Sequence, residues 1–300
     1  MKLQMPELPE VEALRLSLLP VLTGRAIEKI FVAKPKLVSS HKTQRSEDLD
    51  KLNEFILELT GEKILDIKRR AKNLFFVFES GKVMLVHLRM TGQLVFRDKF
   101  NLAFGGHPIK NSVSDLPNKH SHVVFELDKG TLYYNDIRMF GCLLYFKSMP
   151  ALQESGVLGN LGIEPLEEFS FAEFNTAMRR FKSNVKKVFL EQKAIVGLGN
   201  IYCDEVLFDA AVLPTTNITE LSEQQMQRLY KSIKKIMPLA VTKGGSSVAN
   251  YVLGDGSGGS YADLHLVYGR AGKPCLKCGD ILQKTAVNQR TTVYCMNCQS

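Results

Sequence analysis

Four cysteines near the end of the chain have the spacing of a metal site. They form the pattern C-x2-C-x16-C-x2-C, made by Cys275, Cys278, Cys295 and Cys298. A hairpin can bring two such thiolate pairs together, and zinc prefers a tetrahedron of ligands of this kind. Four protein ligands leave no open coordination position, so the spacing predicts one structural Zn2+ and no catalytic metal.

Arg290 lies in NQRTTVYC, near the middle of the segment between the two cysteine pairs. The tip of the predicted hairpin falls there. A guanidinium on a rigid two-stranded tip can bind phosphate with two parallel hydrogen bonds. A solvated surface arginine is the alternative that this segment alone leaves open.

The segment MPELPEVE places Pro6 at the start of a predicted helix. Proline suits the first turn of a helix, where its missing N–H has no partner to lose. Leu8, Val11, Leu14 and Leu18 then recur at helical spacing. Glu7 and Glu10 suit the positive end of the helix dipole. Taken alone, the segment predicts a capped surface helix.

The chain up to about residue 146 reads mainly as strands. Short runs rich in β-branched and aromatic residues alternate with Gly, Asn or Asp: NLFFVFE, KVMLVHL, GQLVF, HVVFEL, GTLYYN and CLLYF. This regular spacing predicts a β-sandwich or barrel. The interruption at 98–119 contains glycines and prolines and is predicted to be a loop.

A change of character occurs at 149–165, a connection that contains Pro and Gly. Beyond it, 167–194 is predicted to be helical, with Ser170 and Glu173 spaced as a capping box. Further helices are predicted at 202–211 and 219–242. The glycine-rich stretch from about Gly244 to Tyr261 follows, and it is predicted to be a binding loop or a hinge.

The net charge and hydropathy limit the classes of partner and compartment. Lys and Arg number 39 against 31 acidic residues, which gives a net charge of +8. This balance suits nucleic acid first and an anionic membrane surface second. The first residues lack the apolar core of a signal peptide, and no apolar run reaches the length of a membrane span. A cytoplasmic protein is expected, associated with the nucleoid in a bacterium.

Several motifs occur together in one order along the chain. PELPEVE is followed by RRAKNL at 69–74, HLRMTG at 87–92, DIRMFG at 136–141, VGLGNIY at 196–202 and the cysteine hairpin. In this order they resemble the formamidopyrimidine-DNA glycosylase family, over nearly the whole chain. PELPE is similar to the branch of that family that removes oxidised purines.

The resemblance implies an α+β fold. It combines a β-sandwich N-terminal domain carrying an N-terminal helix with a helical domain containing a helix–two-turns–helix motif and a zinc hairpin. We expect the β-sandwich at 1–148, a linker at 149–165, the helical DNA-binding domain with its lesion loop at 166–264 and the zinc hairpin at 265–300. Duplex DNA is expected in a basic cleft between the domains.

The family resemblance also implies roles for the first residues of the helix. Pro6 matches the nucleophile, a secondary amine that attacks the sugar C1′ and forms an iminium. Glu7 resembles the general acid/base, and Glu10 resembles a supporting carboxylate. A proline inside a chain is an amide and cannot attack. We therefore expect that translation begins at Met5 or that processing exposes Pro6.

Other residues match DNA contacts of the family. Lys72 resembles the lysine that contacts the phosphate beside the lesion and assists elimination, and Arg290 resembles the arginine that takes part in the second elimination. Asn200 occupies the junction of two turns and two helices, where backbone N–H groups can bind phosphate. Lys182 and His120 align with further DNA contacts, although each alone reads as an ordinary surface residue. Arg69 and Arg70 are interpreted as solvated charge.

Met90, Arg138 and Phe140 resemble the three residues that probe the duplex. Extruding a nucleotide costs a few kcal/mol, and wedge residues that fill the vacated space offset part of that cost. Core positions for Met90 and Phe140 are the alternative. The Gly244–Tyr261 stretch corresponds to the loop that folds over the flipped base.

The sequence thus predicts a bifunctional DNA glycosylase and AP lyase. It would bind damaged double-stranded DNA, remove 8-oxoguanine or formamidopyrimidines through a Schiff base on Pro6, and cut the strand by β,δ-elimination. A monomer without an organic cofactor or a membrane partner is expected. Two alternatives stay open: a preference for oxidised pyrimidines, and a non-catalytic lesion-binding protein in which Pro6 is not exposed. A zinc-ribbon RNA-binding protein would leave PELPE and the probe motifs unexplained.

Overall fold

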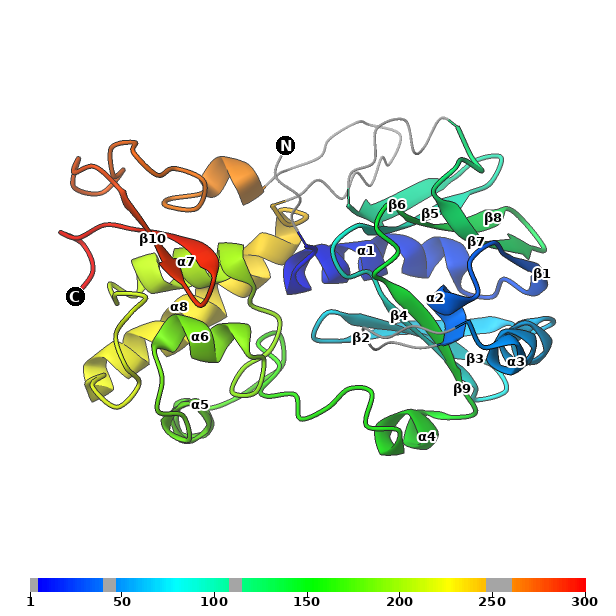
Figure 1. Cartoon of the computed structure of the whole chain (residues 1–300), viewed down its shortest axis with the longest axis horizontal. Helices are drawn as coiled ribbons and strands as arrows, with labels where there is room; N and C mark the ends of the chain where they lie inside the picture. Colours follow the sequence, from blue (N-terminus) through cyan, green and yellow to red (C-terminus); the bar gives the residue numbers. More distant parts are fainter. Residues whose placement is uncertain (1–4, 40–46, 108–114, 247–260) are drawn as a thin grey trace. The chain divides into compact units, whose positions relative to one another are not determined.

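Strands β1 to β9 form two antiparallel sheets that share one hydrophobic core (Figure 1). One sheet has the order β1-β7-β8-β5-β6 and the other has the order β2-β3-β4-β9. The strands span Ile27–Val32, Ile64–Arg70, Asn73–Phe78, Val83–His87, Gly92–Arg97, Leu102–Gly106, Ser121–Leu127, Thr131–Asp136 and Cys142–Phe146. Their aromatic and β-branched side chains explain the strands, and the sandwich predicted from their spacing is confirmed.

Helix α1 (Leu8–Leu22) packs against both sheets of this sandwich. The Arg15 Nη1 atom donates to the Ile67 carbonyl of β2 at 3.2 Å. On β6, a Cβ added to Gly105 would lie 3.1 Å from Leu14 Cδ1, so the glycine allows close contact. Leu14, Leu18 and Leu22 are fully buried. The prediction of a surface helix is therefore wrong, because the helix is a central core element.

Two further features of the β-rich region were not predicted. Helices α2 (Lys36–Ser39) and α3 (Leu49–Leu59) pack against β9, and α4 (Met149–Glu154) follows that strand. The stretch 98–119 is not one loop, since β6 lies inside it and pairs with β5 from Arg97↔Leu102 to Gln93↔Gly106. Strand β6 (LAFGG) ends in two glycines and shows no polar/apolar alternation, so its residues carry no strand signal.

The computed structural model describes residues 5–39, 47–107, 115–246 and 261–300. The chain divides into two compact units, called here the β-rich unit and the helical unit. The β-rich unit contains Glu10–Gly159 and also Pro6, whereas the helical unit contains Glu7–Pro9, Asn160–Ser246 and Ser260–Ser300. Among the described residues, no helix has both the length and the apolar character needed to cross a lipid bilayer.

The helical unit is built around a second hydrophobic core. Its helices are α5 (Phe171–Arg179), α6 (Val185–Leu190), α7 (Asn200–Asp209) and α8 (Glu223–Thr242). The capping box of Ser170 and Glu173 is confirmed at the start of α5. The single helix predicted over 167–194 is instead two, because Asn184 ends the break between them by accepting the Lys187 N–H at 2.8 Å and starting α6.

The helical unit ends in a short 3-10 helix and a hairpin. The 3-10 helix η1 spans Tyr261–Leu264, and strands β10 (Gln283–Val287) and β11 (Arg290–Tyr294) pair antiparallel. Val287 pairs with Arg290, which leaves a two-residue turn at Asn288 and Gln289 with φ of 49° and 58°. Positive φ at both positions is the geometry of a type I′ turn, whose twist matches the strands.

Candidate active site

The Glu7 carboxylate is fixed at the N-terminus of α7. Its oxygens accept hydrogen bonds from the backbone N–H groups of Gly199 at 2.6 Å, Ile201 at 3.0 Å and Tyr202 at 3.4 Å. No side chain of Gly199 can cap this helix, so Glu7 supplies the acceptor from 192 residues away. Glu7 is 3% exposed, and the positive end of the helix dipole favours a carboxylate there.

Two glycines allow the start of α1 to approach this helix end. A Cβ at Gly199 would overlap the Glu7 carboxylate, and one at Gly197 would overlap the Leu8 side chain. Gly197 also has φ of +87°, and its carbonyl accepts the Leu8 N–H at 3.1 Å. The glycines of VGLGN therefore serve close packing against residues 7 and 8.

Gln192 organises the turns between α6 and α7. Its Nε2 donates to the Phe189 and Leu198 carbonyls at 3.0 and 2.6 Å, and its Oε1 accepts the Gly197 N–H at 2.6 Å. Gln192 itself adopts φ of 62°. One side chain thus satisfies three backbone groups of the segment that holds Glu7.

The hairpin tip lies beside the same helix end. Asn200, the first residue of α7, donates from Nδ2 to the Thr291 carbonyl at 2.9 Å. Arg290 precedes Thr291 and is exposed. Asn200 therefore joins the helix end that holds Glu7 to the strand that begins at Arg290. The roles predicted for these residues stay predictions.

A buried ion pair joins α6, α7 and β11 behind this region. Lys186 Nζ lies 2.6 Å from Asp204 Oδ1 and donates to Thr292 Oγ1 at 2.8 Å, and both charged side chains are fully buried. Asp204 Oδ2 accepts the Val293 N–H at 3.0 Å. Burial raises the pKa of Asp204 to about 6, although Lys186 and the Val293 N–H act in the opposite direction. The carboxylate is thus ionised at neutral pH and fixes the strand that carries Arg290.

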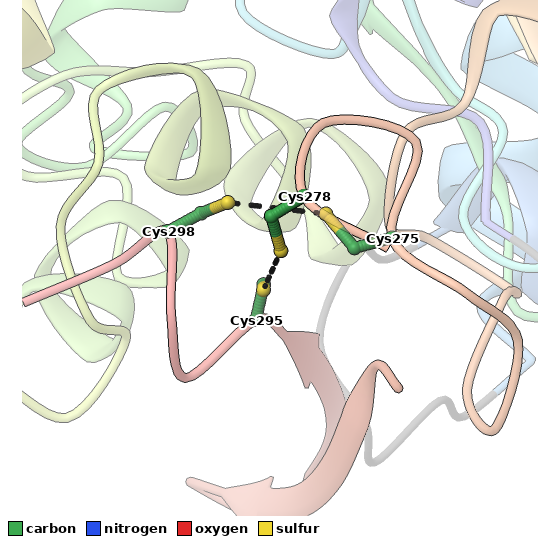
Figure 2. Close-up of side chains that lie close together, drawn as sticks. All are labelled: Cys275, Cys278, Cys295 and Cys298. Carbon is green, nitrogen blue, oxygen red and sulfur yellow. Dashed lines mark hydrogen bonds between the residues drawn. The ribbon is translucent and has the colours of Figure 1, made fainter. Parts of the chain in front are cut away.

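The four cysteines gather at the other end of the hairpin (Figure 2). Their Sγ atoms all lie within 4.8 Å of one another, with 3.5 Å between Cys278 and Cys295 and 3.9 Å between Cys275 and Cys298. A tetrahedron with Zn–S bonds of about 2.3 Å needs sulfur atoms about 3.8 Å apart, so this set fits zinc. The hairpin holds one structural Zn2+, and the prediction from spacing is confirmed.

Lys72 occupies the turn between β2 and β3. Arg70 pairs with Asn73, so the turn consists of Ala71, with φ of 54°, and Lys72, which is 7% exposed. Arg69 Nε lies 2.6 Å from Glu12 Oε2 of α1. The interpretation of Arg69 as solvated charge is therefore wrong, since this buried pair ties the turn to α1.

The electrostatics of Glu12 follow from the same contacts. Burial would raise the pKa of this carboxyl group, but hydrogen bonds from Arg15 and Arg69 outweigh the burial and lower it. Arg15 lies 2.6 Å from Glu12 Oε1. Glu12 therefore remains a carboxylate that accepts from two guanidinium groups next to the Lys72 turn.

Met90, Arg138 and Phe140 lie on two loops at which the chain crosses from one sheet to the other. The first loop joins β4 to β5 and the second joins β8 to β9. The two loops are neighbours because β4 pairs with β9 at His87↔Cys142 and β5 pairs with β8 at Gly92↔Asp136. The Arg138 guanidinium lies 4.4 Å from the centre of the Phe140 ring, and Phe140 is 45% exposed. The structure thus excludes a core position for Phe140, and Met90 is half-buried.

Asp136 holds these two probe loops together. Its carboxylate accepts from the Thr91 hydroxyl and from the N–H groups of Arg138 at 3.2 Å and Gly141 at 2.8 Å. Thr91 in turn accepts the Arg138 N–H at 3.0 Å. Asp136 is fully buried, so a single carboxylate determines where Arg138 and Phe140 emerge.

The other predicted site residues are more loosely connected. The half-buried His120 lies beside the probe loops through its carbonyl, which accepts the Asp136 N–H at 3.0 Å. Lys182 is exposed in the break between α5 and α6. Pro6 and Glu10 are buried at the start of α1. Most of the predicted lesion loop, 247–260, and residues 1–4 lie outside the described residues.

Sequence reasoning missed the residues that position the site. Lys186, Asp204 and Thr91 bind partners that are distant in the chain. Asp136 and Gln192 bind backbone groups of their own loops, but side-chain type alone does not reveal which backbone groups they bind. The one available signal was a charged residue inside or just after a recognised motif, as with Asp136 in DIRMFG and Asp204 two residues after VGLGNIY.

Comparison with known proteins agrees with this geometry. Three family models match: the formamidopyrimidine-DNA glycosylase N-terminal domain over residues 5–143, the formamidopyrimidine-DNA glycosylase H2TH domain over 161–251, and a zinc finger found in FPG and IleRS over 272–300. These matches place the chain among the DNA glycosylases.

Relatives of similar length share the whole chain. It is 37% identical over 297 residues to a formamidopyrimidine-DNA glycosylase of Lactobacillus johnsonii and 38% identical to one of Bacillus cereus, in each case across 98% of this chain and 99% of the relative. The chain belongs to the formamidopyrimidine-DNA glycosylase family.

Solved structures give the same result. A structure of the Lactococcus lactis Fpg with DNA containing an abasic site superimposes with a TM-score of 0.83 at 32% identity, covering 98% of this chain and 99% of that one. The same enzyme with DNA containing N7-benzyl-Fapy-dG also gives 0.83 at 32% identity, with 98% and 100% covered. The predicted α+β fold is therefore confirmed.

Proposed function

We propose that this protein is a base-excision repair enzyme that removes oxidised purines from duplex DNA and then cuts the strand at the abasic site. Family membership supports the glycosylase and lyase activities. The observation that carries the proposal for this chain is the Glu7 carboxylate, held by backbone donors of α7 directly after Pro6. A general acid/base must have a fixed position to be effective, and three donors provide it.

In the proposed reaction the Pro6 nitrogen attacks C1′ of the damaged nucleoside. The C–N bond to the base breaks, the base leaves with a proton, and an iminium joins Pro6 to the opened sugar. Glu7 handles the proton at the sugar oxygen during ring opening. Loss of the 3′ and then the 5′ phosphate by β- and δ-elimination leaves a one-nucleotide gap.

The chemistry requires a free amine at position 6. The reference pKa of a terminal amine is about 8, lower than that of lysine, so a larger fraction is unprotonated at neutral pH. We therefore propose that Pro6 is the first residue of the active enzyme. The N-terminal family model begins to match at residue 5, directly before Pro6, which supports this proposal.

We assign the remaining predicted residues to DNA contacts. Lys72 and Arg290 would bind the phosphates beside the lesion and assist the eliminations, and Glu10 would support Glu7. Asn200, Lys182 and His120 would contact the backbone, while Met90, Arg138 and Phe140 would fill the space left by the flipped nucleotide. Because Lys and Arg contacts release counterions, affinity should fall steeply with salt.

Zinc keeps the hairpin folded and takes no part in the chemistry, because its four ligands are all cysteines. We propose that one chain suffices for activity, since every assigned residue is supplied by this polypeptide. We propose a cytoplasmic location, which in a bacterium would place the enzyme at the nucleoid, where its proposed substrate lies.

Borohydride trapping tests the proposal. A duplex with a single 8-oxoguanine is expected to give a covalent adduct with the enzyme, and peptide mapping should place the DNA on Pro6. Pro6→Gly should lower the yield, and a variant whose residue 6 nitrogen stays in an amide should give none. An undamaged duplex is the control.

Other outcomes separate the alternatives. Adducts that form only with an oxidised-pyrimidine duplex would show that the enzyme acts on oxidised pyrimidines and not on oxidised purines. Salt-sensitive binding without any adduct would indicate a non-catalytic lesion-binding protein. Intact-mass measurement of the active protein completes the test: residues 1–5 retained on an enzyme that still cuts would refute the role of Pro6.

A further inference from the structure

Two arginines tie helix α1 to strand β2 through the Glu12 carboxylate. Arg15, three residues further along the helix, donates from Nη2 to Glu12 Oε1 at 2.6 Å, and Arg69 of β2 donates from Nε to Oε2 at 2.6 Å. The Arg69 side chain is only 6% exposed, and an ion pair shielded from solvent is screened little by salt. A single carboxylate of the helix thus fixes the guanidinium of the strand.

The same guanidinium reaches the turn that follows β2. Arg69 Nη1 donates to the Ala71 carbonyl at 2.9 Å, and this carbonyl belongs to the peptide bond that leads into Lys72. The rigid fork of a guanidinium can hold two acceptors at once. Here Nε binds the Glu12 carboxylate and Nη1 binds the turn. The backbone of Lys72 is therefore placed from α1 by two successive contacts.

The turn needs such support because of its backbone conformation. Ala71 adopts φ of 54°, a conformation that Gly, Asn or Asp usually supplies in a two-residue hairpin turn. Another residue keeps this conformation only where its surroundings hold it there. Arg69 does so through the Ala71 carbonyl. Asn73 adds a second contact, since its Nδ2 donates to the Arg70 carbonyl at 3.2 Å.

We propose that Arg69 is a positioning residue for strand cutting, which holds the Ala71 carbonyl so that Lys72 meets the phosphate beside the lesion in one geometry. The inference rests on the proposed function, in which Lys72 assists the eliminations. Helix α1, which carries Glu12, begins two residues after Pro6. The turn that carries Lys72 is thus anchored to the helix that presents the proposed nucleophile.

Single-turnover cutting of a duplex with a preformed abasic site tests the inference. Arg69→Met keeps the apolar stem of the side chain, and Glu12 keeps its pair with Arg15, so the variant should fold. Without the bond to the Ala71 carbonyl, cutting should slow about tenfold, the effect of one lost hydrogen bond to a charged group. Arg69→Lys keeps the charge beside Glu12 but not the fork. It should fold even if Arg69→Met does not, and it should cut more slowly than wild type.

Lys82→Met is the matched control in the same unit. Lys82 Nζ also joins two carboxylates, at 3.0 Å from Glu58 Oε2 and 3.0 Å from Glu62 Oε1. It lies in the turn after β3, at the opposite end of that strand from Lys72. Its loss should lower stability, yet cutting should stay within about twofold of wild type. Melting temperature identifies any variant that does not fold.

A double-mutant cycle shows whether Arg69 acts through Lys72. If it does, Arg69→Met should slow cutting no further in a Lys72→Met background, whereas a general loss of structure would slow it there as well. Where Lys72→Met cuts too slowly to follow, the same cycle is measured on the Kd for a duplex with a reduced, uncleavable abasic site.

Three results would each overturn the inference: normal cutting by the folded Arg69 variants, additive losses in the cycle, or equal slowing by Lys82→Met. A wild-type enzyme that does not cut the abasic duplex would instead overturn the proposed function, and this inference with it.

Discussion

Buried carboxylates organise the candidate site in both units, but they reach their partners over different distances. In the β-rich unit, Asp136 binds the N–H groups of Arg138 and Gly141, two and five residues further along. In the helical unit, Glu7 binds backbone groups 192 to 195 residues away, and Asp204 binds Val293 across 89 residues.

The difference determines what each carboxylate can do. A local carboxylate fixes the shape of its own loop, so its loss should be felt mainly in that loop. A distant carboxylate fixes one segment against another, so its loss should separate elements that must act together. In the helical unit, α7 therefore carries long-range ties both to Glu7 and, through Asn200 and Asp204, to the hairpin.

The largest effect is expected at Gly199. Gly199→Ala places a Cβ on the Glu7 carboxylate and should slow excision by about 10³-fold, within the range of a lost general acid/base. Gly269→Ala is the matched control in the same unit, because its Cβ would meet nothing within 4 Å and only its φ of +73° opposes the change. Single-turnover rates check this, and equal rates for the two variants would show that Glu7 does not need its place at α7.

The buried ion pair should give the next largest effect. Lys186→Met leaves Asp204 buried without its counter-charge and should lower the free energy of unfolding by about 3–5 kcal/mol. Combining it with Asp204→Leu removes both charges and should restore much of that loss. Denaturant unfolding measures both variants. A double variant less stable than Lys186→Met would mean that Asp204 stabilises the fold through its other hydrogen bonds, such as the one from the Val293 N–H, and not only by neutralising Lys186.

Asp136 is the buried carboxylate of the β-rich unit that fixes its own loop, and its loss should have a smaller effect on stability than loss of Lys186. Asp136→Ala removes an acceptor shared by four donors, the hydroxyls of Thr91 and Tyr134 and the N–H groups of Arg138 and Gly141, and should cost about 1.5–3 kcal/mol of unfolding free energy. Specific binding to a lesion duplex should weaken, while binding to undamaged duplex changes little. Asp98→Ala is the control, since Asp98 also accepts from its own turn, at Phe100 and Asn101, away from the probe loops. Identical effects of the two changes on lesion binding would remove the special role of Asp136.

The smallest effect is a pH dependence from His265. Burial lowers its pKa to about 4 in the folded protein, whereas it is near 6.5 when unfolded, so the unfolded chain binds more protons in between. This contribution to stability is present above pH 6.5 and is lost as the pH falls towards 4. The difference in unfolding free energy between wild type and His265→Leu should shrink from pH 7 to pH 5. A constant difference would contradict the lowered pKa.

Local patterns in the sequence were sufficient for much of the fold. The zinc cysteines, the capping box of Ser170 and six of the strands follow from spacing and side-chain type, because their partners lie nearby in the chain. The motifs also led to Arg138 and Phe140 on an exposed loop and to the exposed Arg290 at the start of β11. The roles assigned to these residues stay predictions.

Contacts between segments that are distant in the sequence could not be predicted from local patterns. From the sequence, Glu7 is interpreted only as a carboxylate that suits the helix dipole, because its contact with the Gly199 N–H is not visible there. Arg69 is likewise interpreted as a solvated charge, because its ion pair with Glu12 is not visible. The burial of α1 between two sheets has the same cause, since Arg15 and Ser17 interrupt its apolar face. No periodicity in one segment reveals a polar partner in another.

The pairing of β10 with β11 has a consequence for the guanidinium at its tip. Successive side chains of a strand alternate between its two faces, so Arg290 emerges on the same face as Thr292, which contacts Lys186. Adding or deleting one residue before Cys295 would reverse that parity and leave the metal ligands intact. The number of residues between Arg290 and the zinc ligand Cys295 therefore determines on which face of the hairpin the arginine side chain lies.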